Sequence, residues 1–139
     1  MSVRPTAAIL VAPGTNRDRD VVLALDLAGA DSVVVSITDL ERNANVIDAA
    51  QMIVIAGGFS FADALGSGHV FALELEMLLG DRLQQAVSDG RPIIGICNGF
   101  QTLVRMGLLS SGAGAMALDH NERGLFDCRW VTLQPSSEK

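Results

Sequence analysis

The sequence is poor in aromatic and basic residues, and this shortage excludes one class of protein. It has no tyrosine, five phenylalanines and one tryptophan, and no lysine before Lys139. Its ten basic residues are scattered among 16 acidic ones, for a net charge of −6. A nucleic-acid-binding surface needs a basic stripe or aromatic stacking platforms, and the sequence offers neither. We therefore expect no nucleic-acid partner.

Long apolar runs and cysteines are also scarce. No run approaches the roughly 20 apolar residues that a membrane-spanning helix requires, so we expect no membrane partner. The first residues contain no apolar stretch followed by a cleavage site, which argues against a signal peptide. In such a chain, the two cysteines, Cys97 and Cys128, are better interpreted as free thiols than as a disulfide. These features predict a cytoplasmic protein, and no residue cluster predicts a metal site.

Apolar residues are plentiful, at 49% of the chain, and they predict one folded domain over residues 1–139. Two kinds of apolar segment alternate. Short β-rich runs predict strands at 7–11, 32–37, 52–56 and 92–96, and a looser alternation predicts a further strand at 125–133. Helical periodicity predicts helices at 18–28, 70–79, 81–89 and 98–106, with a break near Gly80.

Alternating strands and helices with short connections predict an α/β fold, a three-layer sandwich around a mostly parallel sheet. The consecutive β-branched residues Val33 to Val35 suit a parallel strand that is covered on both faces. Ligands of such sheets bind at the carboxyl ends of the strands. Three turns follow predicted strands, at Pro13-Gly14, Gly57-Gly58 and Cys97, so we expect them to form one site.

The run Gly95-Ile96-Cys97-Asn98-Gly99 has a nucleophile flanked by glycines, between a predicted strand and a predicted helix. A nucleophile on such a sharp turn points out of the sheet, and its neighbours must be small. The positive end of the following helix would favour a thiolate there. Cys97 is therefore a candidate catalytic nucleophile, although a buried cysteine at an ordinary turn would fit the same pattern.

The run Gly57-Gly58-Phe59-Ser60 follows another predicted strand. Two glycines let the backbone approach a ligand closely and expose its N–H groups. Such groups can form an oxyanion hole for a tetrahedral intermediate. On its own, the run fits a plain tight turn equally well.

Together these motifs resemble the glutaminase component of phosphoribosylformylglycinamidine synthase, a branch of the class I glutamine amidotransferases. Residues 95–101, Gly-Ile-Cys-Asn-Gly-Phe-Gln, are similar to that family's nucleophile elbow. Residues 57–63 are similar to its glycine-rich loop. The usual family form has an aromatic residue, a glycine and an aspartate at the positions of Phe61, Ala62 and Asp63.

Other segments of this family are resembled by residues 13–16 with Asp18, and by Asn121, Phe126, residues 128–131 and Leu133. The resemblance therefore covers essentially the whole chain. It implies a flavodoxin-like, class I glutamine amidotransferase-like fold. It also implies that Cys97 hydrolyses glutamine to glutamate and ammonia. A separate synthetase subunit would use the ammonia with ATP and Mg²⁺ to make phosphoribosylformylglycinamidine, so no cofactor is expected on this chain.

The resemblance also implies a set of site residues. The oxyanion would be held by the backbone N–H groups of Asn98 and of either Gly58 or Phe59. Asp63 would either bind the substrate amine or support the loop, and loop support is the favoured reading. Beside Cys97, the predicted oxyanion and substrate residues are Gly57, Gly58, Phe59, Asn98 and Gln101.

The family's catalytic His and Glu would lie beyond Lys139, so we expect the domain over residues 1–139 to lack them. His120 and Glu122 have the same spacing, but the resemblance places them on a connecting loop. His69 is expected on a helix surface. Two alternatives stay open: a catalytically incomplete binding module of the synthase complex, or another elbow-cysteine thiol hydrolase. An uncovered sheet edge would also favour self-association.

Overall fold

The computed structural model describes residues 3–110 and 115–134. Its four strands form one sheet in the order β2-β1-β3-β4. All neighbours are parallel, and in the centre Ala8 of β1 lies opposite both Val33 and Ile53. The strands are β1 (Thr6–Val11), β2 (Asp31–Ser36), β3 (Met52–Ile55) and β4 (Ile93–Gly95).

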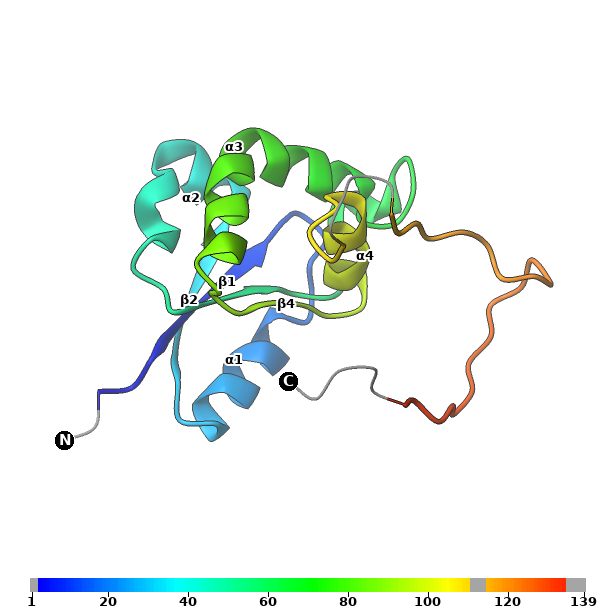
Figure 1. The fold of residues 1–139 in the computed structure, drawn as a ribbon, viewed down its shortest axis with the longest axis horizontal. Helices are drawn as coiled ribbons and strands as arrows, with labels where there is room; N and C mark the ends of the chain where they lie inside the picture. The colour runs from blue at the N-terminus through cyan, green and yellow to red at the C-terminus, as the bar shows by residue number, and fades with distance from the viewer. Residues whose placement is uncertain (1–2, 111–114, 135–139) are drawn as a thin grey trace.

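Helices lie on both faces of this sheet (Figure 1). One face carries α1 (Asp18–Leu27), and the other carries α2 (Ile37–Arg42), α3 (His69–Ser88) and α4 (Asn98–Arg105). The described part of the chain is thus a three-layer α/β structure with a parallel sheet, which confirms the predicted fold class. None of its helices is long and apolar enough to cross a membrane.

The two faces of the sheet bury apolar side chains unequally. The face under α2, α3 and α4 holds one large cluster, which includes Ala8, Leu10, Val35, Leu40, Ile47, Ile53, Ile55, Phe71, Leu75, Leu79, Leu83 and Leu103. The cluster under α1 has four buried members: Ile9, Val21, Val54 and Ala56. Ile94 lies opposite Val54 and therefore points to the α1 face, where its side chain is 43% exposed.

The predicted break near Gly80 is wrong, because α3 runs without interruption from His69 to Ser88. Its inner stripe, from Phe71 through Leu75 and Leu79 to Leu83, is fully buried. A glycine inside a helix costs about 1 kcal/mol. Burying one large apolar side chain contributes about 1.5–3 kcal/mol, so the stripe outweighs the glycine.

The predicted strand at 125–133 is also wrong. All of the described residues from 115 to 134 are exposed, and they run as an extended segment without regular structure (Figure 1). Trp130 is 102% exposed, and Phe126 is 91% exposed. A strand needs a hydrogen-bonded neighbour, and no described strand pairs with the outer edge of β4. The alternating pattern alone therefore did not predict a sheet position.

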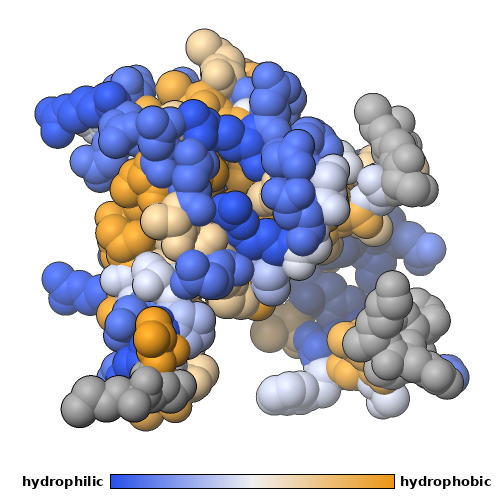
Figure 2. All heavy atoms as spheres, turned by 60° about the vertical axis from the view of Figure 1, so that its left-hand side comes forward, coloured by the Kyte–Doolittle hydropathy of each residue, from blue (hydrophilic) through white to orange (hydrophobic). Residues whose placement is uncertain are grey.

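The edge strand β2 departs from the prediction as well. Val33 and Val34 are 38% and 42% exposed, and only Val35 is buried, so the strand is not covered on both faces. Figure 2, which brings the β2 side forward, shows hydrophobic patches among hydrophilic side chains on this surface. The sequence pattern also did not predict α2, although Ser36 and Asp39 form a capping box at its start.

Candidate active site

Cys97 lies directly between β4 and α4, with φ 52° and ψ −109°. A positive φ is strained for a residue with a side chain, and it turns the chain sharply from strand to helix. The flanking glycines are required by space: a Cβ on Gly95 would lie 2.5 Å from the Gly99 carbonyl oxygen, and one on Gly99 would lie 2.0 Å from that of Ile55. The strand–turn–helix setting predicted for Cys97 is therefore present.

The other two predicted turns meet this elbow. Thr15 forms an isolated antiparallel bridge with Gly58, and the Phe59 N–H donates to the Gly14 carbonyl oxygen at 3.1 Å. A Cβ on Gly57 would lie 3.0 Å from the Ile96 carbonyl oxygen and 3.4 Å from Cβ of Cys97. The three turns thus come together at the carboxyl edge of the sheet.

A cleft of about 750 Å³ opens beside them on the α1 side, and Cys97 is exposed in it. All seven predicted site residues line this cleft: Gly57, Gly58, Phe59, Asp63, Cys97, Asn98 and Gln101. Arg17 and Asp20 line it too and were not predicted; they form an ion pair at 3.0 Å. Only their place next to the first turn could have indicated them.

The predicted oxyanion donors, the backbone N–H groups of Gly58, Phe59 and Asn98, differ in whether they already have an acceptor. The N–H of Phe59 is already engaged by Gly14. Within the described ranges, no acceptor is hydrogen-bonded to the N–H of Gly58 or to that of Asn98. The sequence left open whether the N–H of Gly58 or that of Phe59 would bind the oxyanion. Of these two, only the Gly58 N–H is free to do so within the described part of the chain.

Polar side chains connect the loop after β3 to the elbow. The Asn98 side chain is buried, and its Nδ2 donates to Oδ1 of Asp63 at 2.8 Å. Its Oδ1 accepts from Oγ of Ser60 at 2.5 Å and from the Ser60 N–H at 3.4 Å. Asp63 thus has a partner that supports the loop. Between these contacts, Phe61, Ala62 and Asp63 have positive φ values of 51–54°.

No histidine of residues 3–110 and 115–134 lines the cleft around Cys97. His69 begins α3, and its Nδ1 lies 3.4 Å from Nη1 of Arg105. His120 lies on the exposed segment after α4. Cys128 lies on the same segment, and both cysteines are free thiols, as predicted. The described residues also contain no group of three or more His, Cys, Asp or Glu side chains that could hold a metal ion.

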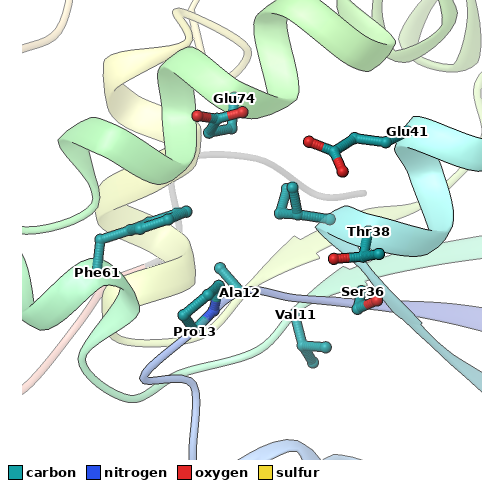
Figure 3. A pocket seen from close by; sticks show the side chains of 9 residues that line it. Val11, Ala12, Pro13, Ser36, Thr38, Glu41, Phe61 and Glu74 are labelled. Atoms are coloured by element: carbon teal, nitrogen blue, oxygen red, sulfur yellow. The ribbon is translucent and has the colours of Figure 1, made fainter.

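A second cavity, of about 370 Å³, lies on the opposite side of the sheet, where β1 and β2 end below α2 and α3 (Figure 3). The side chains of Glu41, Phe61 and Glu74 surround it. Phe61 also packs against the large apolar cluster. The loop after β3 therefore lines both cavities: Phe59 and Asp63 face the cleft of Cys97, and Phe61 faces away from it.

Comparison with known proteins adds independent information. A family model described as a CobB/CobQ-like glutamine amidotransferase domain matches residues 4–139. The phosphoribosylformylglycinamidine synthase subunit PurQ of Treponema denticola is 42% identical over 96% of this chain and 54% of its own length, and that of Thermotoga maritima is 38% identical over 94% and 55%.

A solved structure also matches this chain. The structure of PurLQS from Thermotoga maritima matches with a TM-score of 0.74 and 37% sequence identity. The match covers 93% of this chain and 54% of that chain. This chain thus spans about half the length of the curated relatives it matches.

Proposed function

Because this chain belongs to the family of CobB/CobQ-like glutamine amidotransferase domains, we propose that Cys97 is the nucleophile of a glutamine-hydrolysing site. The ammonia released there serves the synthesis of phosphoribosylformylglycinamidine. Support for this use of the ammonia comes from the similarity to PurQ subunits of phosphoribosylformylglycinamidine synthase.

In the proposed reaction, the Cys97 thiolate adds to the side-chain carbonyl carbon of glutamine. The electron pair of the carbonyl moves to its oxygen, and the N–H groups of Gly58 and Asn98 stabilise the resulting oxyanion. When the oxyanion collapses, the carbon–nitrogen bond breaks and ammonia leaves with a proton from a general acid. Water then hydrolyses the glutamyl thioester to glutamate and regenerates the thiol.

The observation that carries this proposal is the elbow itself. Cys97 holds a strained positive φ at the start of α4, within a cleft that also contains two unengaged backbone donors. The proposal assigns the nucleophile and the oxyanion hole to this chain. It assigns the acid and base to a group outside the described residues, since no described histidine lines the cleft.

Partners follow from the same similarity. We propose that the chain assembles with a synthetase subunit, because the matched solved structure is that of PurLQS. ATP and Mg²⁺ are assigned to that partner, and glutamine is the ligand of this chain. Arg17 and Asp20, which carry opposite charges in the cleft, suit the charged α-carboxylate and α-ammonium groups of an amino acid.

The test is covalent labelling of the full chain with a diazoketone analogue of glutamine, with and without excess glutamine, read by mass spectrometry. Cys128 is a matched internal control, because it too is a free, exposed thiol. We expect an adduct on Cys97 alone, suppressed by glutamine and absent in Cys97→Ser. Iodoacetamide should label both cysteines.

Labelling of both cysteines by the analogue, or labelling that glutamine does not suppress, would contradict a glutamine site. No adduct, with Cys97 still open to iodoacetamide, would instead favour a binding module that hydrolyses nothing by itself. The lack of a histidine in the described cleft is the observation that keeps this second function in view.

A further inference from the structure

We propose that the side chain of Asn98 is a positioning residue that fastens the loop after β3 to the nucleophile elbow and so keeps the Gly58 N–H beside Cys97. The inference rests on the proposed function, since it names what holds the oxyanion hole together. It concerns the amide side chain of Asn98 and not its backbone N–H.

The side chain of Asn98 is hydrogen-bonded to two residues of the loop after β3. Its side chain is only 2% exposed, and it belongs to the residue that follows the nucleophile. Its oxygen accepts from the Ser60 hydroxyl at 2.5 Å, and its nitrogen donates to the Asp63 carboxylate at 2.8 Å. Ser60 and Asp63 are the first and last residues of the 3₁₀ turn that follows the glycines. One side chain therefore binds both ends of this turn.

The chemistry of the three groups fixes the orientation of the amide. An ionised carboxylate can only accept hydrogen bonds, and a backbone N–H can only donate. The amide nitrogen must therefore face Asp63, and the amide oxygen must face the Ser60 N–H. A rotated amide would leave buried polar groups without partners, which is unfavourable.

The turn needs the hydrogen bonds from Asn98 because its backbone is strained. Phe61, Ala62 and Asp63 all hold positive φ values, a region that residues with side chains disfavour. One further restraint is the Phe61 N–H, which donates to the Pro13 carbonyl oxygen at 2.6 Å. If the Asn98 contacts are lost, we expect the turn to relax, and Gly58, two residues before it, to move away from the elbow.

Three variants test the pairing. In Asn98→Asp, a carboxylate faces the Asp63 carboxylate, so like charges repel where a hydrogen bond existed. In Asp63→Asn, the new amide can still accept from Asn98 through its oxygen, so the contact survives. In the double variant, the amide at position 63 donates to the carboxylate at position 98, and the Ser60 hydroxyl keeps its acceptor. Gln84→Glu, on the exposed side of α3, controls for the added charge.

Two measurements on the full chain are compared for each variant. The first is the rate of Cys97 labelling by the glutamine analogue, divided by its rate with iodoacetamide. The second is hydrogen exchange of the backbone amides over residues 57–63, which includes the Phe59 and Phe61 N–H groups. The first reports the formed site, and the second reports the loop without requiring any chemistry.

We expect Asn98→Asp to lower the labelling ratio by roughly tenfold or more, because the Gly58 N–H is displaced; losing an oxyanion donor outright costs about 10²–10³-fold. Exchange over 57–63 should become faster in the same variant. In Asp63→Asn and in the double variant, exchange over 57–63 should stay within about threefold of the wild type, because a hydrogen-bonded pair is present in both. The double variant should also label faster than Asn98→Asp. Gln84→Glu should match the wild type. Recovery in the double variant separates the specific pairing from a general loss of stability.

Wild-type labelling ratio and exchange in Asn98→Asp would overturn the inference, as would a double variant no better than Asn98→Asp. If the wild-type chain takes no glutamine label at all, the proposed function fails. The exchange measurement then still tests whether Asn98 holds the loop. Faster exchange in Asn98→Asp that the double variant reverses would support this role of Asn98. Unchanged exchange in Asn98→Asp would overturn it.

Discussion

On one face of the sheet, α2, α3 and α4 cover a large apolar cluster; on the other, α1 alone packs through its Val21 against three buried residues of the sheet side. The cleft that contains Cys97 lies on the second face, with Val21 of α1 and Ile96 in its lining. A close-packed core has no room for a substrate. The face covered by three helices therefore supplies most of the stability, and the coverage of the other face by α1 alone leaves space for the cleft.

The largest effect is expected from truncating the same residue type on each face. Ile53 of β3 is fully buried in the large cluster, whereas Ile94 of β4 points to the α1 face and is 43% exposed. Ile53→Ala should lower the free energy of unfolding by about 2–5 kcal/mol, because it leaves a cavity. Ile94→Ala should cost about 1 kcal/mol, because little packing is lost.

Urea denaturation of the two variants and the wild type measures this difference. Equal losses of unfolding free energy would show that the two faces contribute equally to stability. Labelling of Cys97 by the glutamine analogue in the folded Ile53→Ala protein should be unchanged, since Ile53 does not line the cleft.

A smaller effect is expected at the loop that borders both cavities. Ala62 has a φ of 53°, a conformation that costs a residue with a side chain about 1–2 kcal/mol relative to glycine. Ala62→Gly should therefore raise the free energy of unfolding by about 0.5–1 kcal/mol, after the extra entropy that glycine gives to the unfolded chain is subtracted. Thermal unfolding followed by circular dichroism would measure this.

Ala64 is the matched control for that variant, because it lies two residues further on with an ordinary φ of −54°. Ala64→Gly should lower the stability. If both variants changed it in the same direction, the positive φ of Ala62 would not be a source of strain.

The smallest effect on stability is expected at the start of α2, at the edge of the face that α2, α3 and α4 cover. The hydrogen bonds from the Ser36 hydroxyl and then from its backbone N–H lower the pKa of Asp39 below its ordinary value. A carboxyl group whose pKa is lowered by folding stabilises the protein above its unfolded pKa, and this contribution disappears as the pH falls through the folded pKa.

Ser36→Ala should therefore lower the stability slightly near neutral pH, and its difference from the wild type should shrink at acidic pH. Thermal unfolding of both proteins across this range measures the difference. A gap that stays constant would show that the charge of Asp39 does not contribute through Ser36.

Much of this architecture was predictable from the sequence. The buried runs of β1 and β3 and the glycine-flanked Cys97 follow from local rules, because burial and sharp turns leave few alternatives in residue type. The strand expected at 125–133 failed because a strand depends on a neighbour, which an alternating pattern does not contain. The break at Gly80 failed because packing of Leu79 and Leu83 outweighs local propensity.

The residues that border the cleft could be predicted in part, but their arrangement could not. The three turns were expected to meet at one sheet edge, and the family resemblance named seven of the residues that line the cleft, but not Arg17 or Asp20. The sequence could not show that Gly14 occupies the Phe59 N–H, or that Asn98 binds Ser60 and Asp63, because these contacts depend on positive φ values at Phe61 and Ala62 that no residue type there indicates.

The exposed position of Trp130 has a spectroscopic consequence. The chain has one tryptophan and no tyrosine, so its intrinsic fluorescence comes almost wholly from an indole on the segment after α4. That emission should resemble free tryptophan in water while the segment is uncovered. A subunit that docks on this segment should shift the emission to the blue, and quenching by iodide should weaken at the same time. Trp130 is thus an intrinsic fluorescent probe of whatever covers the exposed segment after α4.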